Sequence, residues 1–386
     1  MSKVIAGMSG GVDSSVTAYL LKEQGYDVEG LSFILWEARQ RNDFTTCCSL
    51  QAIEDAARTA SKIGIPHSSF DVRDDFIEKV IDPFVDAYTK GMTPNPCILC
   101  NRHIKFPFLL REAEKRSAEF IATGHYAKIE RKRGLLGDSP EARSAEVRLK
   151  KGIDPKKDQS YFLYVLRREE LERLLLPLGE HKKEDVRNIA KNLGLPSAQR
   201  PESQEICFIE DKNYFKFINK LSPLSDTTGP VMDMNGKILG EHKGIYHYTI
   251  GQRKGLGISS PQPLYVAKID AVKNIVYVGP QESAELKEFE VGNLNWLMLL
   301  SDTETRRHGD TETFTEPLRH RVAASAIKVT VKVRSMMKAE PATISFNQDR
   351  GIVKVIFEEP QWAPAPGQSA VFYEEDTVIG GGIIRG

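Results

Sequence analysis

The first 210 residues alternate short apolar runs with segments whose apolar residues recur at helical spacing. Apolar runs near residues 4–6, 28–36, 67–70 and 120–123 predict buried strands, and the stretches 14–24, 49–63 and 74–90 between them predict helices. Further helical patterns cover residues 171–176 and 182–193, and residues 206–209 form a short apolar run that predicts a strand. Strands alternating with helices predict an α/β fold with a doubly wound parallel sheet, whose ligand binds at the carboxyl ends of the strands.

The pattern changes near residue 211, where helical spacing gives way to short strands. Asn235-Gly236 is a hairpin signal between two apolar runs, and residues 264–269 and 275–278 predict further strands. Residues 327–334 alternate, so we expect Val329, Val331 and Val333 to face inward and Lys328, Lys332 and Arg334 to share the outer face. The glycine run 380–382 in a final strand predicts close packing or a bulge.

A glycine-bearing loop follows the first strand and leads into a helix that begins near Ser14. Gly10 and Gly11 lack a Cβ, so backbone N–H groups can approach an oxyanion, and Ser9, Ser14 and Ser15 add hydroxyls. We therefore expect the loop to hold a phosphate chain. No lysine follows the glycines, so the loop does not match G-x-x-x-x-G-K-[ST]. The residue types leave two roles open for Asp13, a magnesium ligand or a helix cap.

Two of the five cysteines form a C-x-x-C pair, Cys97 and Cys100, in the stretch TPNPCILCN. Prolines 94 and 96 stiffen this stretch, and a helix is expected to begin at Asn101. A helix N-terminus and local cations at residues 102, 103 and 105 would lower the thiol pKa, although the motif alone fits a zinc half-site equally well. For Cys47, Cys48 and Cys207 we expect a packing role rather than a chemical one, because free cysteines are more often simply buried.

Length and charge set further bounds on the function. The chain of 386 residues has 53 basic and 53 acidic residues, so any nucleic-acid contact must be a local patch. No segment approaches the ~20 apolar residues of a spanning helix, and the cysteines do not form a secreted disulfide framework. We expect a cytoplasmic protein without a membrane partner. Gly124 and His125 follow a predicted strand end, which favours an active-site role for the histidine over a packing role.

Seven motifs occur in one order: GMSGGVDSS, TPNPCILCN, ATGHYA, KDQSYFLY, ICFI, YTIGQRKGLGI, and PGQSAVFY with GGGII. SGGVDSS resembles the pyrophosphate-binding loop of N-type ATP pyrophosphatases (adenine nucleotide alpha hydrolase-like), and the whole set resembles the tRNA-specific 2-thiouridylases, the MnmA family. The resemblance implies a tRNA-uridine 2-sulfurtransferase. Such an enzyme uses ATP with Mg²⁺ to adenylate the C2 oxygen of the wobble uridine, releasing pyrophosphate. Sulfur from a cysteine persulfide then replaces that oxygen, giving 2-thiouridine and AMP.

The resemblance also implies partners and domains. The partners are the anticodon stem-loop of tRNA and a sulfur donor such as a cysteine desulfurase or a sulfur-relay protein. Residues 1–210 would form the ATP pyrophosphatase domain, 211–282 a small β-rich central domain that contacts tRNA, and 283–386 a C-terminal β-barrel that binds tRNA.

The family's functional residues carry over by position. Cys100 corresponds to the nucleophile and Cys207 to the persulfide carrier, and the two can form a redox disulfide after sulfur transfer. Positions that match ATP contacts are Gly7, Met8, Ser9, Gly10, Gly11, Val12, Asp13, Ser14, Phe33 and Gly124. Positions that match the target-base segment are Asn95, Pro96 and Cys97, and those that match tRNA contacts are His125, Lys157, Asp158, Gln159, Arg334, Ser335 and Gln368.

The chain departs from the family pattern at Cys97, where the family has aspartate, and at Ser203-Gln204-Glu205, where it has S-T-G. Cys97, Cys100 and Cys207 could therefore hold a [4Fe-4S] cluster whose open iron carries hydrosulfide, as an alternative to the persulfide. Two other classes remain open from the sequence. One is an AMP-forming ligase that acts on a small molecule, and the other is a non-enzymatic RNA-binding module whose cysteines hold a metal.

Overall fold

The computed structural model describes residues 1–36, 50–132, 146–199, 206–209, 213–221, 227–298, 326–347 and 349–386. The chain divides into two compact units, which are described separately. Unit 1 comprises Met1–Asp86 and Asn95–Pro223, and unit 2 comprises Ala87–Pro94 and Leu224–Gly386. Residues 37–46 and 301–320, the dipeptide Cys47-Cys48 and the tripeptide at 203–205 lie outside the described residues.

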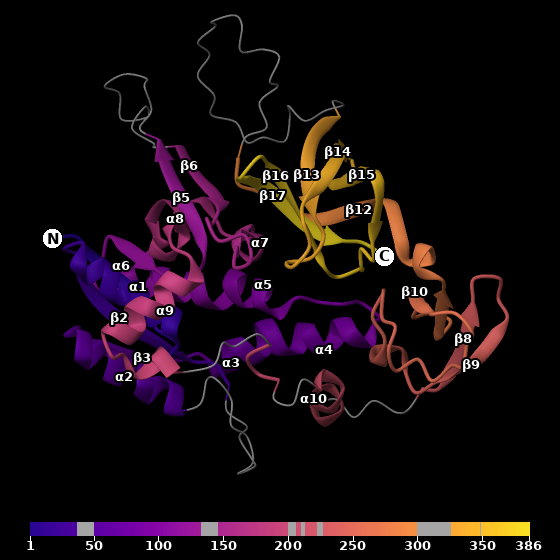
Figure 1. Cartoon of the computed structure of the whole chain (residues 1–386), viewed down its shortest axis with the longest axis horizontal. Coiled ribbons are helices and arrows are strands. Elements are labelled where there is room, and N and C mark those ends of the chain that lie inside the picture. The colour runs from indigo at the N-terminus through magenta and orange to yellow at the C-terminus, as the bar shows by residue number, and fades with distance from the viewer. Residues whose placement is uncertain are drawn as a thin grey trace, which may run out of the picture. The chain divides into compact units, whose positions relative to one another are not determined.

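A parallel sheet forms the centre of unit 1 (Figure 1). Its described strands are β1 (Lys3–Gly7), β2 (Asp27–Ile34), β3 (His67–Asp71), β4 (Phe120–Ala122) and β7 (Leu174–Leu175), in the order β3-β2-β1-β4-β7. All four pairings between neighbours are parallel. The predicted doubly wound sheet is confirmed, although residues 174–175, which were expected to be helical, form its edge strand.

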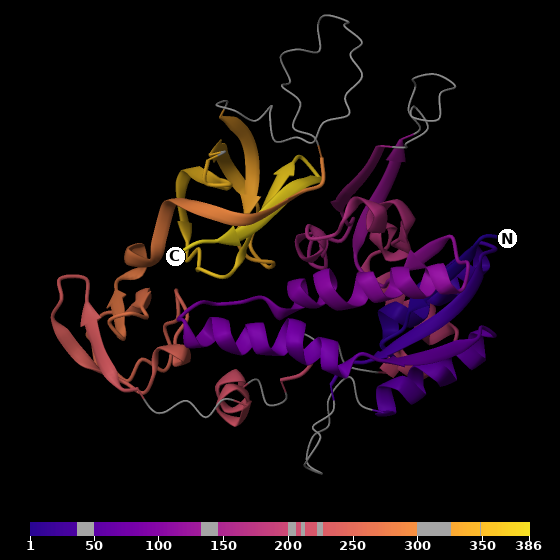
Figure 2. The same cartoon turned by 180° about the vertical axis from the view of Figure 1, so that it is seen from behind.

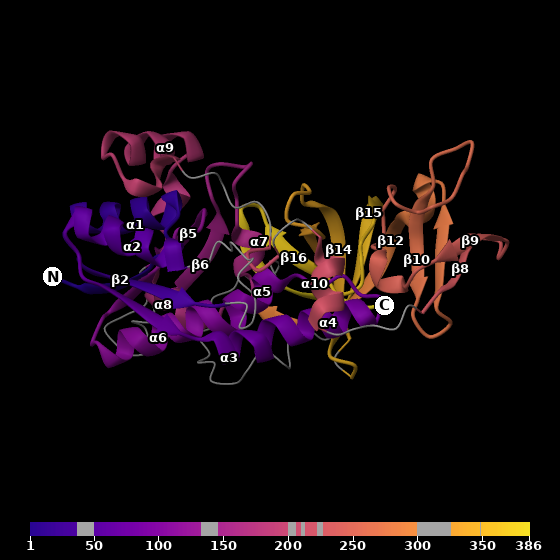
Figure 3. The ribbon, with the colours of Figure 1, turned by 90° about the horizontal axis from the view of Figure 1, so that it is seen from below.

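Helices cover both faces of this sheet. The helices α1 (Val12–Glu23) and α2 (Leu50–Ile63) lie on one face, and α6 (Phe106–Lys115) lies on the other (Figure 3). Fully buried apolar residues of β1, α1 and α2, among them Val4, Ala18 and Ala56, fill the space between helices and sheet. The chain leaves β1 for β2 on one side and returns to β4 on the other, so the sheet has its topological switch point between β1 and β4.

Two helical runs of unit 1 contain π-helical turns. The first consists of α3 (Arg73–Phe76), a π turn at Ile77–Ile81 and α4 (Asp82–Thr89), as the sequence predicts. The second consists of α5 (Pro96–Cys100), a π turn at Asn101–Lys105 and α6. The prediction that this helix begins at residue 101 is wrong, because Asn95 accepts a hydrogen bond from the Ile98 N–H and Pro96 occupies the first turn.

The remaining described elements of unit 1 come after β4 in the chain. They are β5 (Ala127–Lys132) paired with β6 (Glu146–Lys151), α7 (Ser160–Leu163), α8 (Arg168–Arg173), 3₁₀ turns at Pro177–Glu180 and Pro196–Gln199, α9 (Lys183–Asn192) and α10 (Tyr214–Leu221). The strand predicted at residues 206–209 is absent, and these residues form a turn closed by a hydrogen bond from the Ile209 N–H to the Ile206 carbonyl.

Unit 2 contains a four-stranded sheet in its central part. Its described strands are β8 (Gly229–Asp233), β9 (Ile238–His242), β10 (Tyr265–Asp270) and β11 (Ile275–Gly279), in the order β10-β11-β8-β9, with 3₁₀ turns at Ile245–His247 and Gln281–Ala284. The predicted hairpin is confirmed: β8 and β9 pair antiparallel, and Gly236 adopts a φ of +86° in the turn between them.

A six-stranded antiparallel barrel follows the four-stranded sheet in the chain (Figure 2). Its strands are β12 (Glu285–Trp296), β13 (Ile327–Lys332), β14 (Glu340–Asn347), β15 (Ile352–Trp362), β16 (Ser369–Glu374) and β17 (Thr377–Ile384). Pairing runs β12-β15-β14-β13-β16-β17, and β17 closes on β12.

Two predictions about barrel residues have different outcomes. Close packing at the glycine run is confirmed, because a Cβ on Gly382 would lie 2.4 Å from the Gly292 carbonyl oxygen. The inward valines of β13 are buried as expected. The outer row of cations is only partly correct: Lys328 is exposed, but Lys332 is buried, and Arg334 lies after the strand and donates to the carbonyls of Ile250 and Ala363.

Candidate active site

The loop after β1 folds on its own serines. The hydroxyl of Ser14 accepts from the Ser9 N–H at 3.1 Å and donates to the Gly11 carbonyl at 3.1 Å. The hydroxyl of Ser15 also donates to the Gly11 carbonyl, at 2.8 Å, and accepts from Ser197 at 3.1 Å. These hydroxyls therefore shape the loop, and the first N–H groups of α1, which have no intrahelical acceptor, remain for a ligand.

The two loop glycines are required for different reasons. Gly10 adopts a φ of +74°, and a Cβ on it would lie 2.2 Å from the Ala52 carbonyl oxygen, so the fold itself requires glycine there. Gly11 has an ordinary φ of −86°, and the nearest atom to its Cβ would be the Ser9 hydroxyl at 3.5 Å. Because the protein leaves the space beside Gly11 open, its missing side chain is best explained by a ligand that approaches the backbone.

Gly124 brings the end of β4 against the same loop. A Cβ on Gly124 would lie 2.9 Å from the Asp13 carbonyl carbon and 2.9 Å from the Ser14 nitrogen. The strand β4 pairs directly with β1, so the loops after both strands meet at the switch point. The predicted juxtaposition of the phosphate loop with residues 124–125 is confirmed.

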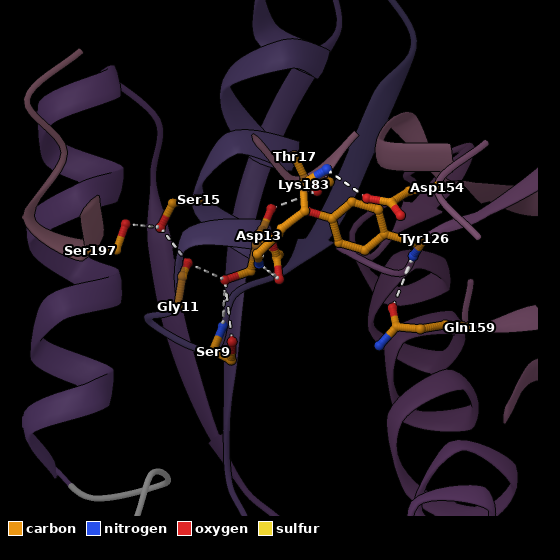
Figure 4. A network of polar contacts seen from close by, with 11 residues as sticks. Ser9, Gly11, Asp13, Ser15, Thr17, Tyr126, Asp154, Gln159, Lys183 and Ser197 are labelled. Carbon is orange, nitrogen blue, oxygen red and sulfur yellow. Dashed lines mark hydrogen bonds and ion pairs between the residues drawn. The ribbon is translucent and has the colours of Figure 1, made fainter. Parts of the chain in front are cut away.

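Asp13 forms the centre of a polar network at the start of α1 (Figure 4). Its carboxylate accepts from the Lys183 ammonium at 2.6 and 2.7 Å and from the Tyr126 hydroxyl at 2.7 Å. Lys183 begins α9, and its backbone N–H donates to Asp154 at 3.1 Å. The predicted capping role of Asp13 is wrong, because its side chain makes no cap hydrogen bond to α1.

Three of the predicted ATP contacts, Gly7, Met8 and Phe33, lie at or just after the ends of β1 and β2. Gly7 is the last residue of β1, and the Met8 carbonyl accepts from the Ser32 hydroxyl at 2.6 Å. That hydroxyl also lies 2.8 Å from His67 Nε2. The ring of Phe33 contacts Phe108 edge to face at 6.3 Å. Phe33 thus lies near the carboxyl edge of the sheet.

His125 is held as a neutral imidazole. Burial, and secondarily the charge of Lys105, lower the pKa of His125 to about 3. Its Nδ1 lies 2.8 Å from the Thr123 hydroxyl, and its ring stacks on Phe106 at 5.9 Å with planes 28° apart. A neutral imidazole can both donate and accept a hydrogen bond, which suits contact with an uncharged base edge.

The KDQS stretch lies against Tyr126. Gln159 accepts from the Tyr126 N–H at 2.9 Å and donates its own N–H to the Tyr126 carbonyl at 2.8 Å. Asp158 accepts from the N–H groups of Gly152 and Ser160 and from the Ser160 hydroxyl, which holds the turn before α7. Lys157 is partly exposed next to them.

The C-x-x-C cysteines lie in α5, with Cys100 buried and Cys97 partly exposed. Burial raises the pKa of Cys100 to about 11; Lys105 opposes this shift and the neighbouring Cys97 adds to it. The expectation that local cations lower this thiol's pKa is therefore wrong, because desolvation outweighs the lysine. Cys100 is a protonated thiol in this conformation.

Cys207 lies in the turn at residues 206–209, next to a deeply buried aromatic ring. Phe208 is 3% exposed and contacts the rings of Phe76, Phe84 and Phe217 at 5.7, 5.5 and 5.2 Å. This aromatic contact fixes the turn that carries the cysteine. Residues 97, 100 and 207 are all thiols, and no disulfide joins them.

The donor set for a cluster is not assembled. Within the described ranges, no three His, Cys, Asp or Glu side chains gather closely enough to hold a metal ion. The three cysteines therefore do not fit a shared iron–sulfur cluster in this arrangement.

Three predicted tRNA contacts belong to unit 2. Arg334 is anchored by the carbonyls of Ile250 and Ala363, Ser335 follows it in a turn, and Gln368 donates to the Thr93 carbonyl at 3.1 Å. No helix in the described part of the chain is long and apolar enough to cross a membrane.

The sequence interpretation missed Lys183 and Tyr126. Lys183 follows another lysine at a helix start, a pattern typical of solvated surface, and its partner Asp13 is 170 residues away. Only the absence of a lysine in the glycine loop hinted that a cation must come from elsewhere.

The chain is similar to known proteins over its whole length. Family models match residues 2–211 (tRNA methyl transferase HUP domain), 216–280 (tRNA methyl transferase PRC-barrel domain) and 286–384 (aminomethyltransferase beta-barrel domain). The tRNA-specific 2-thiouridylase MnmA 2 of Thermoanaerobacter sp. (strain X514) is 46% identical over 100% of this chain and 98% of its own length. MnmA of Clostridioides difficile (strain 630) is 44% identical over 99% and 98%. Among solved structures, the U34-tRNA thiolase NcsA from Methanococcus maripaludis aligns with 57% of this chain and 65% of its own, at 17% identity and a TM-score of 0.33.

Proposed function

Because the chain belongs to the MnmA family of tRNA-specific 2-thiouridylases, we propose that it adenylates the C2 oxygen of the wobble uridine and replaces it with persulfide sulfur. Family membership removes the small-molecule ligase and the non-enzymatic RNA-binding module as alternatives. The observation that carries the adenylation step is the open space beside Gly11, in a loop at the switch point of the sheet.

ATP is proposed to bind along this loop. The N–H groups at the start of α1 face the phosphates, with Gly7 to Ser14 and Gly124 around them and Phe33 near the adenine. The Asp13 carboxylate offers the hard oxygen ligands that Mg²⁺ prefers, and Mg²⁺ would neutralise charge on the phosphates. The residues at this site therefore fit the cofactor.

Adenylation needs an oxygen nucleophile at the α-phosphorus. The uracil O2 attacks Pα, the bond from Pα to the bridging oxygen breaks, pyrophosphate leaves with that electron pair, and the N3 proton is released. This converts a poor leaving group into AMP. We propose that Asn95, Pro96 and Cys97 bind the target base with the neutral His125, and that Lys157, Asp158, Gln159, Arg334, Ser335 and Gln368 contact the tRNA.

Sulfur transfer is proposed to use two cysteines. The terminal sulfur of a Cys207 persulfide attacks C2, and AMP leaves with the C–O electron pair. The Cys100 thiol then loses its proton and its sulfur attacks the Cys207 sulfur, which forms the Cys100–Cys207 disulfide and releases 2-thiouridine, whose N3 takes up a proton. The transferred sulfur gains the two electrons that the cysteines lose, so a dithiol reductant must reset the enzyme.

The partners follow from this chemistry. A sulfur donor of the cysteine desulfurase or sulfur-relay class must load Cys207, and we expect the reaction to occur in the cytoplasm. The persulfide is favoured over the cluster as sulfur carrier, because the described cysteines do not form a cluster's ligand set.

Nucleoside mass spectrometry after one turnover tests the proposal. Anaerobic, metal-stripped protein loaded with persulfide is mixed with ATP, Mg²⁺ and unmodified tRNA, next to Cys100→Ser and Cys207→Ser variants. We expect 2-thiouridine from the wild type only, and pyrophosphate release from all three proteins. Thiolation by Cys207→Ser would refute the persulfide route, and an absence of pyrophosphate from the wild type would refute the function itself.

A further inference from the structure

Lys183 lies buried beside the phosphate loop. The residue is 9% exposed, and its ammonium lies 2.6 and 2.7 Å from the two Asp13 oxygens and 5.5 Å from the centre of the Tyr126 ring. Figure 4 shows the side chains of Lys183 and Tyr126 converging on Asp13, in the first turn of α1. The Lys183 ammonium therefore lies next to the loop that the sequence predicts to bind phosphate.

The phosphate loop itself carries no cation. Residues 7–15 include no lysine or arginine, although the triphosphate of ATP is highly charged. Backbone N–H groups and a helix N-terminus supply partial charges only. A full positive charge must come from another element, and Lys183 at the start of α9 is held there by its own backbone hydrogen bond to Asp154.

A purely structural ion pair is the competing explanation. Buried ion pairs contribute little to stability, because desolvation of both charges offsets their attraction. Asp13 in this pair is 34% exposed at its side chain, so one face of the carboxylate is open to solvent. A partly exposed ion pair next to a phosphate-binding loop is better explained by a role in ligand binding than by a role in stability. We infer that the two charges separate when the ligand binds.

Resting on the proposed function, we propose that Lys183 is a further catalytic residue that binds the pyrophosphate leaving group. When Mg²⁺ and ATP enter, Asp13 turns to the metal and the Lys183 ammonium donates to oxygens of the β- and γ-phosphates. As the bond from Pα to the bridging oxygen breaks, the negative charge that develops on pyrophosphate lies against this ammonium. The lysine gives up no proton, and the uracil oxygen takes the place of the leaving oxygen on Pα.

The test compares Lys183→Met and Lys183→Arg with a matched control, Lys191→Met, which changes an exposed lysine of the same helix. Binding of Mg²⁺-pyrophosphate and of AMP is measured by calorimetry, and tRNA-dependent pyrophosphate release in a single turnover. For Lys183→Met we expect pyrophosphate affinity to fall about tenfold or more, the usual effect of a lost charge-assisted contact, with AMP affinity changed less than about twofold. The arginine variant should recover part of the loss, and the control should match the wild type.

Metal-free binding gives a second, independent measurement. Without Mg²⁺, Asp13→Asn removes the negative charge that neutralises the Lys183 ammonium, so we expect this variant to bind pyrophosphate at least as tightly as the wild type. Equal loss of AMP and pyrophosphate binding in Lys183→Met, or unchanged pyrophosphate binding, would overturn the proposal. A wild type that binds pyrophosphate through Lys183 but releases none from ATP with tRNA would instead refute the proposed function.

Discussion

Gly11→Ala tests whether Gly11 is needed for ligand binding, whereas Gly10 is needed for the fold. Alanine at position 11 meets no strain, because φ is −86° and the new Cβ would lie 3.5 Å from the Ser9 hydroxyl. Replacing glycine at an N-cap with alanine costs about 0.5 to 1 kcal/mol, and the stiffer unfolded chain returns about 0.4 to 1 kcal/mol. The net change in unfolding free energy should therefore stay within about 0.5 kcal/mol, a Tm shift of about 2 °C or less.

Gly10→Ala is the matched contrast. A left-handed φ of +74° costs an alanine about 1 kcal/mol, and its Cβ would meet the Ala52 carbonyl oxygen at 2.2 Å. Overpacking against the backbone adds about 1 to 3 kcal/mol, so the total loss is about 2 to 4 kcal/mol. We expect this variant to lower Tm by about 4 to 16 °C, with its activity loss accompanied by lost structure.

The activity of Gly11→Ala should fall without that loss of structure. A methyl group in the open space displaces the phosphates by about 1 Å, and a displacement of that size can reduce the rate about 10²-fold. The assay is single-turnover pyrophosphate release with saturating tRNA and varied ATP, at a temperature below the Tm of both variants. If Gly11→Ala retains wild-type kcat/KM for ATP, or loses as much stability as Gly10→Ala, the space beside Gly11 does not receive ATP.

Three further predictions concern burial at the proposed site. The rate at which iodoacetamide alkylates Cys100, measured by peptide mass spectrometry, should rise as the pH approaches about 11. Lys105→Ala should move this rise to higher pH, because the lysine stabilises the thiolate. His125 has a folded pKa of about 3, below its unfolded value of about 6.5. Its contribution to stability is therefore complete above pH 6.5 and is lost as the pH falls toward 3. In His125→Gln, the free energy of unfolding measured with urea should depend less on pH over this range. Phe208→Leu should cost about 1 to 3 kcal/mol and slow sulfur transfer from Cys207 while pyrophosphate release continues, and equal slowing of both steps would contradict a positioning role.

Local chemistry in the sequence was sufficient to predict several features of both units. Three features follow from residue types alone. They are the glycines and serines of the phosphate loop, the Asn235-Gly236 turn and the inward valines of β13. The start of α5 was predictable as well, because Asn95-Pro96 is a typical N-cap followed by a first-turn proline. That signal was misassigned in favour of the next asparagine.

Properties that depend on burial could not be predicted from local sequence. The cations near Cys100 indicate a reactive thiolate, yet the pKa rises because the surrounding helices remove water from the sulfur. Lys332 alternates like a surface residue and is buried in the barrel wall. In each case the sequence gives the charge of the group, while its environment is set by elements distant in the chain.

The Asp13–Lys183 pair is the strongest example, and it links the missed residues to the chemistry. A loop of glycine and serine can approach phosphate closely because it has no long side chains, but the same composition leaves it without a charge to oppose the triphosphate. The charge comes from α9 instead, with Tyr126 after β4 and Asp13 in α1 as its partners. Ligand binding must therefore rearrange contacts among three elements of unit 1 at once. A nucleotide that lacks the β- and γ-phosphates leaves the Asp13–Lys183 pair intact, so AMP should protect the start of α9 from hydrogen exchange less than Mg²⁺-ATP does.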